Sequence, residues 1–189
     1  MNQPAVWYLM RASGIVALLL LTAVSALGVA TVTRWRPGRT SRFLALGLHR
    51  SISLLAVAFL AIHVLTAIVD PDAAVRLVAV VLPLPLGHAG IWVALGALAF
   101  DLVAAITITS VLRERLSPRA WRGVHLAAYA AWPVALLHGI GMGTDAGAGW
   151  MLAVDAACIG LFAAAVALRL WKAPSGESKH LAPRMRVAP

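Results

Sequence analysis

Four histidines lie within two long apolar segments of the chain, and their spacing is nearly the same in both. His49 and His63 are 14 residues apart, and His125 and His138 are 13 residues apart. Ionisable side chains are costly inside a membrane and are usually functional where they occur there. Imidazole is a common ligand of iron, zinc and copper, so the pattern indicates a metal or metallocofactor site.

The number of ligands in each pair distinguishes between these metals. Two histidines that face each other suit a six-coordinate haem iron, which takes one axial ligand on each side of the macrocycle. A hydrolytic zinc site needs three or more close ligands and an open position, and these segments contain few carboxylates. We therefore expect haem, with hydrogen-bonded structural histidines as the alternative. The many alanines of these segments leave room for a macrocycle, but they equally favour close helix packing.

The composition requires a membrane around these histidines. The 189 residues are 61% hydrophobic and 12% charged, which excludes a water-soluble globule and a disordered chain. The single cysteine, Cys158, excludes a disulfide scaffold. An apolar stretch of about 20 residues can span a bilayer. The expected fold is an all-α integral membrane bundle of five helices, at about 5–33, 43–69, 88–112, 119–142 and 149–171.

The basic residues indicate on which side of the membrane each loop between these helices lies. Of the 16 lysines and arginines, all but Arg11 and Arg76 cluster in or beside the loop between the first and second helices, in or beside the loop between the third and fourth, or at and after the end of the fifth. Short loops rich in Lys and Arg stay cytoplasmic, so we expect the N-terminus outside and the C-terminus inside. Topology thus explains the net charge of +9, and no nucleic-acid partner is inferred. Residues 173–189 are expected to form a disordered basic tail after the membrane domain of residues 1–172.

This topology places the histidines in two layers. The second and fourth helices run in the same direction, so His49 and His125 lie near the inner surface and His63 and His138 near the outer one, about 20 Å away. Fourteen residues complete about four helical turns, but thirteen fall short. The fourth helix therefore needs local overwinding, a kink or differently oriented ligands, and Pro133 is the expected site of the correction.

Two stretches of the chain resemble the ferric-reductase-like transmembrane domain family: HRSISLLAVAFLAIH from His49 and WRGVHLAAYAAWPVALLHG from Trp121. The opening WYLMRASG from Trp7 is also similar to the first helix of bacterial members. The family includes ferric reductases, the membrane part of NADPH oxidases and the haem subunit of bacterial methionine sulfoxide reductase systems. The resemblance covers about residues 5–171. It implies two b-type haems, an inner one on His49 and His125 and an outer one on His63 and His138, in a cell membrane such as the bacterial inner membrane.

The chain departs from the larger members of that family. It ends at Pro189 and contains no strand followed by a G-x-G-x-x-G turn and a helix. We expect electrons to come from a flavoprotein, a quinol or a separately bound flavin. We expect the acceptor to be a periplasmic reductase or a small molecule.

Two arginines adjoin the inner histidines. Arg50 and Arg122 are expected to pair with haem propionates, because guanidinium binds carboxylates well. Snorkelling of these side chains to the inner surface is the alternative. The roles of Asp101 and His88 stay open.

The expected function is that of a dihaem b-type cytochrome, the membrane subunit of a reductase system, which carries electrons outward. One alternative is a non-redox membrane anchor or assembly subunit with structural histidines. A second is a metal-ion transporter, which fits less well because only Asp101 offers a carboxylate near the midplane. No catalytic side chain is expected in the chain, and whether it acts as an enzyme or as an electron-transfer subunit stays open.

Overall fold

The long helices of the protein are sufficient for five membrane crossings. The computed structural model describes residues 3–33, 42–71, 73, 75–85 and 90–172. Within these ranges the elements are α1 (Gln3–Val32), α2 (Arg42–Val69), α3 (Leu77–Val81), α4 (Gly90–Val111), a 3-10 turn (Arg113–Arg115), α5 (Pro118–Leu126), α6 (Ala128–Met142) and α7 (Gly149–Trp171). Five segments are long and apolar enough to cross a bilayer, with α5 and α6 together forming the fourth. The predicted five spans are confirmed; the predicted tail and His88 lie outside the described residues.

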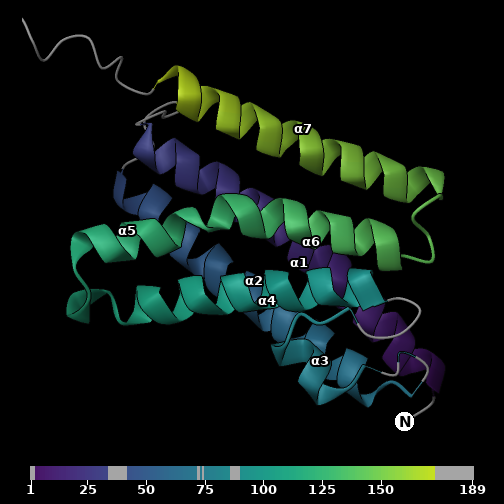
Figure 1. Ribbon diagram of the computed structural model, residues 1–189. Coiled ribbons are helices and arrows are strands. Elements are labelled where there is room, and N and C mark those ends of the chain that lie inside the picture. Colours follow the sequence, from purple (N-terminus) through teal and green to yellow (C-terminus); the bar gives the residue numbers. More distant parts are fainter. Residues whose placement is uncertain (1–2, 34–41, 72, 74, 86–89, 173–189) are drawn as a thin grey trace, which may run out of the picture.

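The helices run alongside one another in alternating directions (Figure 1). Helix α2 packs chiefly against α1, and α6 packs chiefly against α4, while α1 also contacts α6 and α7. We call one end of the bundle the arginine-rich end; there α1 ends, α2 and α5 begin, and the described cations include Arg50, Arg113, Arg115, Arg119, Arg122 and Arg169. At the opposite end α1 and α7 begin, and the short helix α3 packs against α4.

Polar groups inside the bundle are satisfied locally, as a hydrocarbon environment requires. Thr22, Ser25 and Thr107 each donate a hydroxyl hydrogen to the carbonyl four residues earlier, at 2.8–2.9 Å. The compact core is small and lies where α1, α6 and α7 meet; it consists of Leu18, Trp132, Leu136 and Cys158. Large apolar side chains on the outward faces, such as Phe43 and Leu65 of α2, are exposed and suited to lipid.

The fourth span winds more tightly at Ala127. There the N–H of Ala127 donates to the Val124 carbonyl at 2.9 Å, and the N–H of Ala130 donates to the Ala127 carbonyl at 3.0 Å. Bonds between residues three apart wind the chain more tightly than an α-helix. The predicted correction at Pro133 stays a prediction; α6 continues through this proline, and the tighter winding at Ala127 lies six residues before it. A 3-10 turn advances about 20° more per residue than an α-helix, so the turn at Ala127 supplies part of the overwinding that a 13-residue spacing needs.

Candidate functional site

The structure brings the four histidines together in two pairs, one at each end of the bundle. His49 of α2 and His125 of α5 have ring centroids 6.3 Å apart, with ring planes at 64°. His63 of α2 and His138 of α6 have centroids 6.1 Å apart, with planes at 75°. We call them the arginine-end pair and the opposite-end pair. Because α2 packs on α1 and α6 on α4, the imidazoles face each other across the space between two packed helix pairs.

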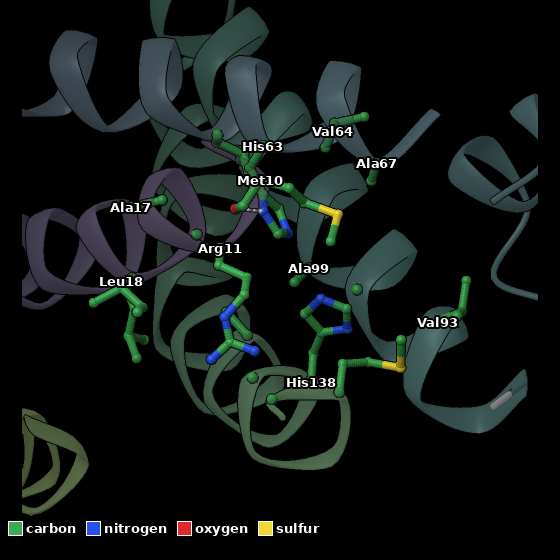
Figure 2. A pocket seen from close by; sticks show the side chains of 18 of the residues that line it. Met10, Arg11, Ala17, Leu18, His63, Val64, Ala67, Val93, Ala99 and His138 are labelled. Atoms are coloured by element: carbon green, nitrogen blue, oxygen red, sulfur yellow. Dashed lines mark hydrogen bonds between the residues drawn. The ribbon is translucent and has the colours of Figure 1, made fainter. Parts of the chain in front are cut away.

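Both separations match two imidazoles bound to opposite sides of one metal ion. A metal–nitrogen bond of about 2.0 Å, plus about 1.1 Å from that nitrogen to the ring centroid, separates the centroids by about 6.2 Å. Figure 2 shows the imidazoles of His63 and His138 pointing toward each other. Among the described residues, no group of three or more His, Cys, Asp or Glu side chains could hold a metal ion. The two imidazoles of each pair, and the distance between their centroids, therefore fit haem iron and do not fit a zinc centre with three protein ligands.

Backbone carbonyls fix the orientation of the opposite-end pair. His63 Nδ1 lies 2.8 Å from the Met10 carbonyl oxygen of α1, and His138 Nδ1 lies 2.8 Å from the Trp92 carbonyl oxygen of α4. A carbonyl only accepts, so each Nδ1 carries the hydrogen and donates it. Each Nε2 then keeps its lone pair for a metal, which is the usual arrangement around ligating histidines.

Three glycines allow the imidazoles to approach the neighbouring helices this closely. A Cβ at Gly14 would lie 2.9 Å from His63 Nδ1, and one at Gly96 would lie 2.6 Å from His138 Cε1. At the arginine-rich end, a Cβ at Gly28 would lie 3.4 Å from His49 Cε1. Gly14 and Gly96 each follow by four residues the carbonyl that accepts from the histidine, so one helical turn supplies both the acceptor and the clearance.

The arginine-end pair is held differently. His49 interacts with the Val24 backbone of α1, but neither His49 Nδ1 nor His125 Nδ1, both buried, has a hydrogen bond of ordinary geometry. The indole of Trp121 stacks on His125 at 4.9 Å, and the Arg113 guanidinium lies 4.5 Å above that indole. Aromatic stacking thus replaces the carbonyl as the support of His125. Buried ring nitrogens without protein partners fit a site that a bound group completes.

A cavity of about 390 Å³ surrounds the opposite-end pair. Its walls come from α1, α2, α3, α4 and α6, and small residues such as Gly14, Ala17, Ala67, Gly96, Ala97 and Ala135 form much of the lining. This size lies within the range of cofactor and small-molecule sites, and the lining is largely apolar with a few convergent polar groups. The space therefore suits a flat, mostly apolar cofactor between the two imidazoles.

The two arginines expected beside the inner histidines lie at the arginine-rich end with exposed side chains. Arg122 Nε donates to the Pro118 carbonyl of its own helix at 2.9 Å, and Arg50 follows His49 in α2. The sequence interpretation did not single out Arg11, which lines the cavity at the other end, or the three glycines beside the imidazoles. One signal was present for the glycines: Gly14 and Gly28 are 14 residues apart, as are His49 and His63.

Residues 13–136 match the family model of the ferric reductase like transmembrane component. The chain belongs to this family. The match includes His49, His63 and His125 and stops two residues before His138, so structure alone places the fourth histidine with its partner. Neither a curated protein nor a solved structure matches the chain significantly. Membership, together with five apolar spans, makes the protein a multi-pass membrane component of electron transfer.

Proposed function

We propose that this ferric-reductase-like protein is a dihaem b-type cytochrome that carries electrons from the cytoplasmic side of a membrane to an acceptor at the outer side. The observation that carries the proposal is the pair of imidazole separations, 6.3 and 6.1 Å. His49 and His125 would hold one haem, and His63 and His138 the other. Haem supplies the one-electron chemistry, while the protein supplies ligands, burial and charge.

Two layers of histidines suit transfer across a bilayer. The 14 residues between His49 and His63 correspond to about 20 Å of helix, a large part of the roughly 30 Å hydrocarbon thickness. A single haem near one surface would leave most of that distance uncrossed. Two haems, one near each surface, would divide it into shorter steps.

The topology supports the proposed direction of transfer. The described cations gather at the arginine-rich end, and short basic loops remain cytoplasmic, so this end faces the cytoplasm in our proposal. The proposed donor is therefore a cytoplasmic flavoprotein, or a quinol or flavin bound near the membrane. The proposed acceptor at the outer end is a periplasmic reductase or a small molecule, and the proposed location is the bacterial inner membrane. Arg50 and Arg122 are proposed to bind propionates of the inner haem.

Purified protein tests the proposal directly. A preparation from haem-replete cells should show the reducible absorbance spectrum of a b-type haem, with about two haems per chain by pyridine haemochrome assay. A colourless preparation of folded, helical protein would support a non-redox membrane anchor whose histidines only hydrogen bond to neighbouring helices. A preparation containing stoichiometric zinc or copper in place of haem would contradict both readings.

A further inference from the structure

Trp121 contacts both the ring of a proposed haem ligand and a cation of the adjacent loop. Its indole stacks on the imidazole of His125, with centroids 4.9 Å apart and planes at 24°. The Arg113 guanidinium lies 4.5 Å from the centroid of the same indole. Among the described residues, the buried Nε1 of this indole has no hydrogen-bond partner. Ring contacts, and not a hydrogen bond, therefore orient Trp121.

The short connection between α4 and α5 brings these side chains together. Arg113 begins the 3-10 turn that directly precedes α5. Ser117 caps α5, because its hydroxyl accepts from the Ala120 N–H at 3.2 Å. Trp121 and His125 are four residues apart in α5 and so share one face of this helix. A fixed turn and a single helical turn thus connect the exposed cation to the imidazole.

His125 has little other support. It lies in the last turn of α5, which packs chiefly against α4, and the winding changes directly afterwards at Ala127. Its Nδ1 has no hydrogen-bond partner among the described residues, whereas His63 and His138 each bond to a backbone carbonyl. Apart from its partner histidine, Trp121 is the described ring that contacts this imidazole and can fix its plane.

We propose that Trp121 is a positioning residue that sets the ring plane of His125, and that Arg113 acts through Trp121 on the haem at the arginine-rich end. The inference rests on the proposed function, in which His125 binds that haem. The Arg113 side chain is exposed, where water and salt screen a charge, but the indole holds its guanidinium within about 9 Å of the imidazole. A positive charge near a haem favours the reduced state, because reduction adds one electron.

The role of Trp121 is tested on the full-length haem-loaded protein in detergent. Trp121→Leu should release the haem of the arginine-rich end about tenfold faster than the wild type, and it should change the electron paramagnetic resonance spectrum of that haem, which reports ligand orientation. Trp121→Phe keeps a stacking ring and should restore most of both properties. His63→Ala, which should retain only this haem, identifies its signals. Trp171→Leu is the matched control, because Trp171 lies at the same end and is 82% exposed.

The role of Arg113 is tested by redox titration. Arg113→Gln should lower the midpoint potential of the same haem, with a change of about threefold in its reduction equilibrium, or about 28 mV. Arg115→Gln removes an equal charge from the same 3-10 turn, where the described contacts include no ring beneath Arg115, and should shift the potential less. In a Trp121→Leu background, Arg113→Gln should shift the potential no more than Arg115→Gln does. Arg113→Lys should keep a potential near that of the wild type, because an ammonium group also binds over an indole.

Each result decides for or against the inference. Selective haem loss in Trp121→Leu, recovery in Trp121→Phe and an Arg113→Gln shift that requires Trp121 support it. Equal retention and spectra in Trp121→Leu and Trp171→Leu overturn it, as do equal shifts in Arg113→Gln and Arg115→Gln, since any surface charge would then act alike.

These contrary results leave the proposed function standing if the wild type contains two haems. Wild-type protein without haem overturns the proposed function and this inference with it. Should Trp121→Leu not fold, the spectrum of Trp121→Phe and the comparison of Arg113→Gln with Arg115→Gln decide the matter.

Discussion

Gly14 of α1 lies so close to the imidazole of His63 that a methyl group in its place would meet Nδ1 at 2.9 Å. The same imidazole donates to Met10 one helical turn earlier. A side chain at position 14 would therefore push His63 away from the carbonyl and change its orientation relative to its partner histidine. The absence of a side chain at position 14 therefore helps to set the orientation of the His63 imidazole.

Alanine in place of each glycine should disturb the neighbouring histidine more, the shorter the distance between the added Cβ and the imidazole. Gly96→Ala and Gly14→Ala should each lower occupancy of the opposite-end haem several-fold, because the added carbon would lie at 2.6 and 2.9 Å from an imidazole. Gly28→Ala should have a small effect, since 3.4 Å is ordinary contact. Haem content per chain measures the effect.

Gly160→Ala is the control for this series, because a Cβ there meets nothing within 4 Å. It should preserve both haems. Equal haem loss in Gly160→Ala and Gly14→Ala would show that the loss does not come from the missing clearance beside His63.

Each single histidine substitution should remove one haem, and the remaining haem should be bound more tightly in one variant than in the other. His63→Ala should keep only the haem of the arginine-end pair, and His49→Ala only that of the opposite-end pair. The second should hold its haem more tightly, because hydrogen bonds of ordinary geometry to Met10 and Trp92 orient both of its ligands. At the arginine-rich end, His49 has only a looser interaction with the Val24 backbone, and His125 Nδ1 has no hydrogen-bond partner.

Competition with free imidazole, followed by absorbance, measures this difference. We expect imidazole to displace the haem of His63→Ala at about tenfold lower concentration than the haem of His49→Ala. A tenfold difference is the lower end of the usual effect of losing the hydrogen-bond partners of ligating histidines. Two haems retained in His63→Ala would refute the ligand assignment, and the reverse order of sensitivity would refute the role of the carbonyls.

The buried hydrogen bond between α1 and α6 should contribute to stability without controlling haem. Trp132 Nε1 donates to Thr22 Oγ1 at 2.7 Å, and the indole stacks on Phe162 with centroids 4.0 Å apart. Thr22→Val would leave the indole N–H without an acceptor and should destabilise the bundle by about 1 kcal/mol. Thermal unfolding in detergent measures this, and the haem spectrum should stay unchanged.

Ser25→Ala provides the comparison, because Ser25 bonds only to the Leu21 carbonyl of its own helix. Its unfolding temperature should lie near that of the wild type. A Thr22→Val protein as stable as Ser25→Ala would mean that the indole N–H finds another acceptor.

Pro133 should be dispensable for the phase of the fourth span. The tighter winding lies at Ala127, and α6 continues through the proline. Pro133→Ala should therefore retain both haems and their spectra, since it restores one backbone donor without changing the register between His125 and His138. Selective loss of either haem in this variant would place the correction at the proline after all.

Most of the fold follows from hydropathy, because a spanning helix needs a long apolar segment and little else. The pairing of histidines also follows from residue order, since alternate spans run in the same direction and bring equal depths together. Gly14 and Gly96 escaped notice because small residues in membrane helices serve helix packing as often as cofactor clearance. Arg11 was counted among the outer charges because apolar patterning cannot show which way a side chain points.

The break at Ala127 could not be read from the sequence for a different reason. Proline is a visible helix breaker, whereas alanine favours helix, so local preference pointed to Pro133. The change of backbone hydrogen bonding at Ala127 is visible only in the structure.

The central position of α1 has a mechanical consequence. Met10 and Gly14 of this helix contact the imidazole of His63, and Gly28 contacts that of His49. The helix also contacts α2, α6 and α7. Sliding it along its axis would disturb ligand geometry near both faces of the membrane in the same instant. The contacts of α4 at Trp92 and Gly96 hold the imidazole of His138.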